Sequence, residues 1–233
     1  MADTISRTFQ FTNINRVSFS ALGTIRLIQG DEESVLVEGS EEALEHVKIS
    51  QENGTILVRL YTWYDFLFIP RSAAYTIRVK NLESFTISGS AEMDCDGIVA
   101  DDSAFELNTS GSGRVRINEL KSRDLNISSS GSGNYDIRLV ETNHLKAAIS
   151  GSGNYRLAGS AETVSLHISG SGEIEAADLA SKTSEVHISG SGRITTQVSD
   201  QLDVHISGAG DVIYTGDPKV NHSISGSGKV RRR

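Results

Sequence analysis

The sequence predicts an all-β fold: a single-stranded parallel β-helix-like solenoid with about 20 residues per coil and a less regular β N-terminal part. Two observations carry this prediction. The tetrapeptide Ser-Gly-Ser-Gly recurs at a nearly constant interval, and apolar residues alternate with polar ones around each copy. A repeat this short cannot bury its own apolar face, so the copies must stack on one another as coils. We expect right-handed coils, because parallel crossovers strongly prefer that hand.

The repeat occupies residues 85–233, which we expect to form the solenoid. Successive copies of the tetrapeptide, exact or nearly so, are separated by 22, 20, 20, 19, 20, 18 and 18 residues. A flexible Gly/Ser linker would keep neither this interval nor patterned apolar flanks. The copies begin at Ser88, Ser110, Ser130, Ser150, Ser169, Ser189, Ser207 and Ser225.

Apolar residues occupy every second position within a coil, as in a strand with one buried face. The position just before the tetrapeptide and the position five residues after its first serine are examples. The position before the tetrapeptide holds Ile149, Ile168, Ile188 and Ile206. The position five residues after the first serine holds Tyr135, Tyr155, Ile174 and Ile194. The same alternation places both glycines of the tetrapeptide inward and both serines outward. Inward glycines would let the backbone bend and narrow the coil at a corner.

Two outward columns carry charges that alternate in sign from coil to coil. One column holds Asp94, Arg116, Asp136, Arg156 and Glu175, and the other holds Glu173, Arg193, Asp211 and Lys229. A slip by one coil would place like charges together, so we interpret both columns as a control on register. They also pair most of the carboxylates that could otherwise be proposed as catalytic.

Residues 7–84 form the less regular part, which we expect to cap the solenoid and to be continuous with it. Short alternating segments at 7–11, 17–22, 24–29, 34–39, 47–50, 55–60 and 75–79 predict strands. Asn53 and Gly54 predict a hairpin between two of them. Ser40 is a candidate N-cap for one helical turn over 40–47. A cap is needed because an unpaired terminal coil invites edge-to-edge association.

Charge and composition exclude several classes of protein. The net charge of −8, with a single short basic run at Arg231–Arg233, argues against a nucleic-acid partner and against adsorption to an anionic membrane. No segment approaches the roughly 18–20 apolar residues of an integral membrane span. Cys95 is the only cysteine, so no internal disulfide forms. The tetrapeptide lacks the lysine and the helix of a phosphate-binding loop, and we expect no cofactor.

Three stretches of the chain resemble the auto-transporter adhesin head domain family, also called the GIN domain. They are FSALGTIRLIQGDEESVLVEG followed by ENGTILVRL, the serial SGSG coils, and the closing GAGDVIYTGDPKVNHSISGSGKVRRR. The resemblance covers residues 7–233. It implies a β-helix-like fold and an extracytoplasmic location, at the cell surface or in the periplasm, in Bacteroidetes-type bacteria. It implies no reaction and no established ligand. The location assumes that a leader is missing from this chain, and a cytoplasmic location is the alternative.

Three histidines form a candidate metal site. His167, His187 and His205 stand two residues before the first serine on consecutive coils and face outward. Imidazole is the commonest transition-metal ligand. However, side chains stacked about 4.8 Å apart in a straight row converge poorly on one ion. The alternative is a solvated polar stack.

An aromatic segment is the candidate binding site. Tyr61, Trp63, Tyr64, Phe66 and Phe68 make up five of the fourteen aromatic residues and include the only tryptophan. Alternation would bury some of these rings and expose others, and exposed rings favour protein interfaces or sugar stacking. The alternative is that the segment packs over the end of the solenoid as core.

The outward serines are a third candidate. Two hydroxyls per coil could contact a glycan or another repetitive surface, or they could satisfy backbone groups at the corners.

These features favour a non-enzymatic cell-surface or periplasmic module, an adhesin that binds a glycan or a protein. The runner-up is a β-helical carbohydrate-active enzyme, which would need a cluster of unpaired carboxylates or a carboxylate–Ca²⁺ site in a groove. A third reading is a structural spacer that forms homo-oligomers through the aromatic segment.

Overall fold

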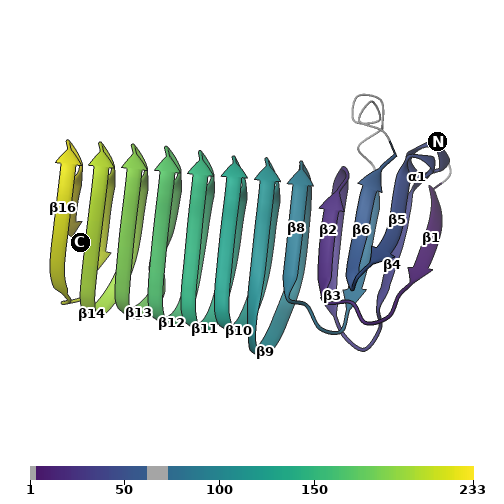
Figure 1. Ribbon diagram of the computed structural model, residues 1–233, viewed down its shortest axis with the longest axis horizontal. Helices are drawn as coiled ribbons and strands as arrows, with labels where there is room; N and C mark the ends of the chain where they lie inside the picture. The colour runs from purple at the N-terminus through teal and green to yellow at the C-terminus, as the bar shows by residue number, and fades with distance from the viewer. Residues whose placement is uncertain (1–3, 62–72) are drawn as a thin grey trace.

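The computed structural model describes residues 4–61 and 73–233, and its coils stack along the long axis of the molecule (Figure 1). Each of six long strands wraps around one coil and pairs in parallel with the next. This confirms the predicted β-solenoid with about 20 residues per coil. The strands are β9 (Ala91–Gly111), β10 (Arg114–Gly131), β11 (Asn134–Gly151), β12 (Asn154–Gly170), β13 (Glu173–Gly190) and β14 (Arg193–Gly208).

The register of these strands places equivalent residues of the repeat directly against each other. Ser130 pairs with Ser150, and Ser150 pairs with Ser169, so the tetrapeptides form a column along the solenoid. Three shorter strands complete the C-terminal end. They are β15 (Asp211–Thr215), β16 (Lys219–Gly226) and β17 (Lys229–Arg232). β15 and β16 both pair in parallel with β14.

The tetrapeptide forms a corner in which its two glycines have different roles. The second glycine is buried, as at Gly153. The first is partly exposed and has a positive φ, 132° at Gly151, which corrects the expectation that both point inward. The alternation of a strand is interrupted there because the chain turns in a conformation that L side chains rarely adopt. A Cβ at Gly151 would also lie 2.3 Å from the carbonyl oxygen of Gly131 on the preceding coil.

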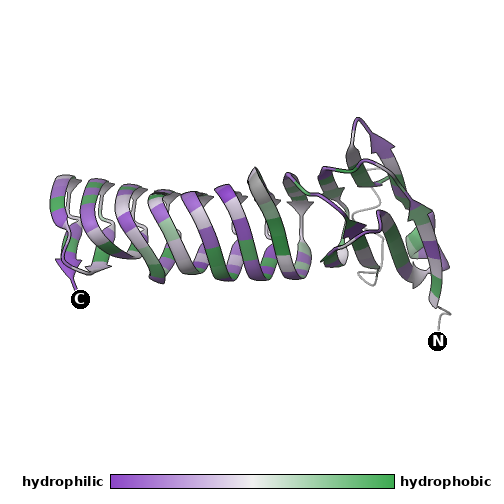
Figure 2. Cartoon of the chain, turned by 90° about the horizontal axis from the view of Figure 1, so that it is seen from below, coloured by the Kyte–Doolittle hydropathy of each residue, from purple (hydrophilic) through white to green (hydrophobic). Residues whose placement is uncertain are grey.

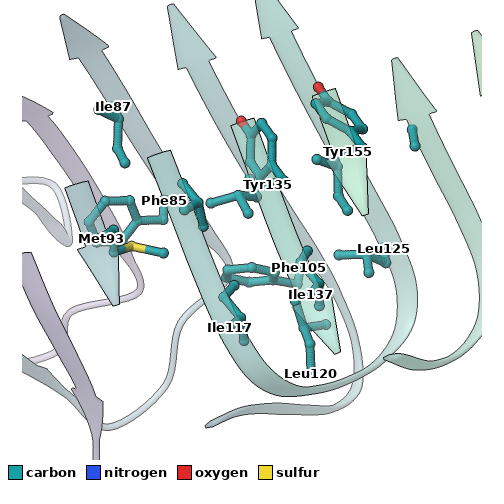
Figure 3. Close-up of a cluster of buried hydrophobic side chains, with 14 of the residues drawn as sticks. Phe85, Ile87, Met93, Phe105, Ile117, Leu120, Leu125, Tyr135, Ile137 and Tyr155 are labelled. Carbon is teal, nitrogen blue, oxygen red and sulfur yellow. The ribbon is translucent and has the colours of Figure 1, made fainter. Parts of the chain in front are cut away.

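The core lies inside the coils, and hydrophilic and hydrophobic residues alternate along them (Figure 2). Tyr135 and Tyr155 are its largest side chains in the middle coils, and their rings meet edge to face with centroids 4.6 Å apart (Figure 3). The Tyr135 hydroxyl lies 2.9 Å from Thr109 Oγ1, and the Tyr155 hydroxyl donates to the carbonyl oxygen of Ala148 at 2.7 Å. Thr109 and Ser129 stand where later coils have isoleucine, which leaves room for the two rings.

The N-terminal part adds eight strands and one short helix. They are β1 (Thr4–Gln10), β2 (Arg16–Ser20), β3 (Gly23–Gln29), β4 (Ser34–Ser40), α1 (Glu41–Glu45), β5 (Val47–Glu52), β6 (Thr55–Leu60), β7 (Ala74–Val79) and β8 (Ser84–Gly89). The predicted hairpin is confirmed, because β5 and β6 pair antiparallel across Asn53 and Gly54, both with positive φ. The predicted N-cap of the short helix is also confirmed, since Ser40 Oγ accepts a hydrogen bond from the Ala43 amide at 3.2 Å.

The order of these strands in space differs from their order in the chain. β2 pairs in parallel with both β6 and β8, and β3 pairs in parallel with both β7 and β9. The pair β2–β3 therefore forms a coil between the first coil of the repeat and the pair β6–β7. The antiparallel strands β1, β4 and β5 add the remaining pairings at the N-terminal end (Figure 1).

The charge columns form ion pairs between neighbouring coils, as expected. Arg156 contacts Glu175 Oε2 through both Nε at 3.0 Å and Nη2 at 2.8 Å. In the second column Arg193 lies 3.6 Å from Glu173. Among the described residues, no helix has the length and apolar character needed to cross a membrane.

Candidate binding groove

A groove of about 700 Å³ runs along one side of the solenoid and crosses the coils from β9 to β16. Its residues come from two outward columns, the first serine of each tetrapeptide and the residue two positions before it, together with the residue between them. They are Thr109, Ser128, Ser129, Ser130, Ala148, Ile149, Ser150, His167, Ile168, Ser169, His187, Ile188, Ser189, His205, Ile206, Ser207, Ser223 and Ser225.

Strand alternation is what brings the histidine and serine of one coil to the same face. Ile168 lies between His167 and Ser169 and is buried, so its two neighbours both point outward. The parallel register then repeats the arrangement on the next coil, where His187 pairs with His167 and Ser189 pairs with Ser169. Two sequence candidates, the histidines and the serines, thus become one surface.

The first serines of the tetrapeptides present a row of free hydroxyls. All six along the groove are exposed, and within the part of the chain described none of their hydroxyls hydrogen-bonds to another protein group. The corners are held instead by backbone bonds between coils, such as the Ser152 amide to the Gly131 carbonyl oxygen at 2.9 Å. The six serines are Ser130, Ser150, Ser169, Ser189, Ser207 and Ser225.

The three histidines stack face to face along the groove. The rings of His167 and His187 are 4.7 Å apart and within 1° of parallel, and those of His187 and His205 are 4.8 Å apart at 20°. Their nitrogens do not converge on a common point. Among residues 4–61 and 73–233, no group of three His, Cys, Asp or Glu side chains could hold a metal ion.

Polar neighbours hold the histidine rings in place. His187 Nε2 lies 2.8 Å from Glu185 Oε1, and His167 Nε2 lies 2.9 Å from Ser165 Oγ. Burial, followed by the proximity of His187 and then Lys146, lowers the pKa of His167, so its ring is neutral at neutral pH. The hydrogen bond with His187 lowers the pKa of Glu185.

Among the described residues, no Asp, Glu, Lys or Arg side chain lines the groove, although these four residue types make up 22% of the chain. Its chemistry is that of hydroxyls, imidazoles and small apolar groups. Hydroxyls donate and accept hydrogen bonds, and a neutral imidazole adds a flat ring face. The groove is therefore suited to hydrogen bonding and stacking.

Two small side chains that sequence reasoning did not treat as a site shape the end of this histidine stack. Ala148, on the coil that precedes His167, pairs with it. Ser128, one coil further towards the N-terminus, pairs with Ala148. A change from small residues to histidines within one outward column was visible in the sequence. Only the structure shows that His167 has a stacked ring on one side and the small side chain of Ala148 at the paired position on the other.

The aromatic segment is described only at its first residue. Tyr61 follows β6, is 62% exposed, and donates its backbone amide to the His46 carbonyl oxygen at 2.9 Å. Trp63, Tyr64, Phe66 and Phe68 lie outside the described residues. Tyr61 does not line the groove.

Comparisons with known proteins give one family and several similar structures. The model of the family described as "Putative auto-transporter adhesin, head GIN domain" matches residues 13–218. No curated protein matches the sequence.

Three crystal structures share the fold over nearly their whole length. A protein of Parabacteroides distasonis described as a putative lipid binding protein is 23% identical, with a TM-score of 0.90 and coverage of 99% of this chain and 97% of that one. A putative adhesin from Parabacteroides merdae is 21% identical, with a TM-score of 0.89 and coverage of 99% and 96%. A putative adhesin from P. distasonis is 20% identical, with a TM-score of 0.89 and coverage of 100% and 98%.

Proposed function

Because this chain belongs to the family of auto-transporter adhesin heads with a GIN domain, we propose that it is a non-enzymatic binding module located outside the cytoplasm. In this proposal the solenoid is a rigid support, and its side groove holds a glycan or protein partner at the cell surface or in the periplasm. The supporting observation is the row of six exposed serine hydroxyls that hydrogen-bond to no other group in the described part of the chain. Such groups can bond to a partner without first giving up internal bonds.

The charge columns argue against the runner-up, a carbohydrate-active enzyme. Acid–base cleavage of a glycosidic bond uses two carboxyl groups that flank the bond. Among the residues that the structure describes, no carboxylate lines the groove. Two carboxylates of the charge columns are ion-paired, in Arg156–Glu175 and Arg193–Glu173. A groove lined by no carboxylate among the described residues lacks the carboxyl pair of this mechanism and supports binding better than glycoside hydrolysis.

The spacer hypothesis explains less of the surface. A spacer needs only the core and the charge columns, so it gives no reason for a continuous uncharged strip with free hydroxyls. The description of the P. distasonis protein as a lipid binder adds a third partner class to be tested, because one of the similar structures bears that name.

The test is a binding screen of the purified chain against a glycan array, mucin and extracellular-matrix proteins, and phosphatidylcholine or phosphatidylethanolamine vesicles. Ala148→Arg places a long charged side chain in the groove. Ala180→Arg makes the same change at an exposed alanine outside it. We expect binding of a glycan or protein that Ala148→Arg abolishes and Ala180→Arg retains.

Other results would redirect or overturn the proposal. Loss of binding in Trp63→Ala/Phe66→Ala, with full binding by Ala148→Arg, would move the site to the aromatic segment. Binding to vesicles alone would replace the glycan or protein by lipid. Binding to none of these partners, or measurable release of sugar from a bound glycan, would contradict a non-enzymatic binding function.

A further inference from the structure

We propose that the groove takes a linear, uncharged glycan, with one sugar ring seated above Ala148 against the open face of the His167 imidazole. This inference rests on the proposed binding function and names the ligand class and the position of its main contact.

His167 is the last ring of the histidine stack on the side of the preceding coil. His167 has one ring face covered by His187, 4.7 Å away and parallel. Its other face points along the solenoid towards the preceding coil, where the paired residue is Ala148. Beyond Ala148 the same column holds Ser128. The surface is therefore lower over these two coils of small side chains than at the flat His167 ring. Ser128, Ala148 and His167 all line the groove.

The exposed surface beside the His167 ring is suited to a second flat ring. A flat ring with an apolar face and a polar edge can pack against a second flat ring, as aromatic side chains do. The C–H face of a pyranose offers such a surface, and its hydroxyl groups remain at the edge. The lowered pKa of His167 keeps the imidazole neutral at neutral pH, so stacking on it requires no desolvation of a charge.

A row of serine hydroxyls runs beside the histidine column. Serine hydroxyls both donate and accept, which matches the hydroxyls of a sugar without imposing one polarity. Coils stack about 4.8 Å apart, a distance comparable to one unit of an extended glycan. A linear glycan along the axis could therefore meet an equivalent serine at successive sugars, from Ser130 towards Ser225.

The described residues that line the groove include no Asp, Glu, Lys or Arg. Beside Ala148 and the histidines, the charged side chains of the next outward column are Lys146, on the coil of Ala148, and Glu185 and Asp203, on the coils of His187 and His205; none of them lines the groove. A polyanionic glycan would meet no lysine or arginine side chain among the described residues that line the groove, and it would approach a chain of net charge −8. The lining therefore selects a neutral glycan.

The opposite end of the stack is a weaker position for the sugar. His205 pairs with Ser223, a small residue on the last coil of the solenoid. Only one coil of small residues follows there, whereas Ala148 and Ser128 provide two. We therefore assign the seat to the Ala148 end.

The experiment is calorimetric titration with cellohexaose, xylohexaose, chitohexaose and the acidic hexagalacturonate. We expect at least one neutral hexasaccharide to bind and hexagalacturonate not to bind. The affinity should change little between 50 and 500 mM NaCl, roughly the range over which the screening length falls severalfold. His167→Ala should weaken binding roughly three- to tenfold, the loss expected for one ring contact.

Two matched variants separate stacking from other effects. His167→Phe retains a flat ring without nitrogens and should restore most of the affinity. His144→Ala removes an exposed histidine outside the groove and should leave the affinity unchanged. In NMR spectra the ring signals of His167 should shift on addition of the neutral sugar, and those of His144 should stay in place. Melting curves of each variant establish that it is folded.

The results distinguish this inference from the proposed function. If the groove variant Ala148→Arg loses binding but His167→Ala binds the sugar fully, the seat on His167 is wrong and the binding function stands. Binding of a mucin or matrix protein with no response to any neutral hexasaccharide would overturn the glycan class. Strong binding of hexagalacturonate would overturn the selection for neutral ligands.

Discussion

The imidazole rings of His167 and His187 lie within 1° of parallel, with their centroids 4.7 Å apart on neighbouring coils. This contact follows from the parallel register, because residues at the same position of the repeat pair directly. It also couples the protonation of one ring to that of its neighbour, because a charge on one disfavours a charge on the other.

The stack predicts that stability falls when the pH drops below neutrality. The pKa of His167 is lowered in the folded chain, so below about pH 6.5 the unfolded chain binds a proton more readily than the folded chain does. Stability present above this pH is lost as the pH falls towards the lowered pKa. Glu185, whose pKa is also lowered, adds a loss of the same sign below its usual pKa near 4.5.

Urea unfolding at a series of pH values between 8 and 5 measures the histidine effect. We expect His167→Gln to flatten the decline below about pH 6.5, and we expect the same substitution at His144 to preserve it. Equal slopes for the wild-type chain and His167→Gln would show that the stack does not carry the pH dependence.

The corner glycines predict a large difference between two Gly→Ala changes. Gly151→Ala brings a Cβ within 2.3 Å of the Gly131 carbonyl oxygen at a φ of 132° and should cost about 2 kcal/mol or more of unfolding free energy. Gly30→Ala, at a site with no atom within 4 Å of the new Cβ, should change it by less than about 0.5 kcal/mol. Similar values for both variants in denaturant unfolding would contradict the role of the corner.

The charge columns predict a context-dependent effect of charge reversal. Arg156→Glu places an acidic residue between Asp136 and Glu175, which pair with position 156 from either side. The melting temperature should fall, and the fall should shrink at high salt because these side chains are exposed. The double variant Arg156→Glu/Glu175→Arg should recover part of the loss. A double variant less stable than Arg156→Glu would argue against pairing.

Cys95 predicts slow thiol chemistry in the folded chain. Its side chain is buried, and burial raises the pKa of the thiol to about 11, so the reactive thiolate is a minor species at pH 8. Labelling with a disulfide reagent should be orders of magnitude faster in guanidinium than in native buffer. Labelling at comparable rates in the two conditions would place Cys95 on an accessible surface.

Much of the solenoid could be predicted because its contacts repeat at a fixed interval in the sequence. Ser150 meets Ser169, and His167 meets His187, because a parallel stack pairs each residue with its equivalent about one repeat away. The alternation of Ile168 with its neighbours then assigns inside and outside. Period and alternation are local properties of the sequence, so register and facing followed from them.

The arrangement of the N-terminal part depends on contacts that no period encodes. β2 lies between β6 and β8, and β3 lies between β7 and β9, so strands distant in the chain interleave. The strands themselves, the Asn53–Gly54 hairpin and the Ser40 cap depend on adjacent residues and were predicted. Their order in space is decided by which apolar faces pack best, which short segments do not specify.

The candidate site divides in the same way. The sequence by itself determined that three histidines and a row of serines stand in neighbouring outward columns, because strand alternation and the repeat fix their positions. Only the tertiary structure decided that the imidazoles stack, with His187 on one side of His167 and Ala148 at the paired position on the other. It also decided that the first serines of the tetrapeptides make no side-chain hydrogen bond within the described residues. Rotamers and hydrogen-bond partners depend on the packing of side chains from neighbouring coils, and a one-dimensional pattern does not contain that packing.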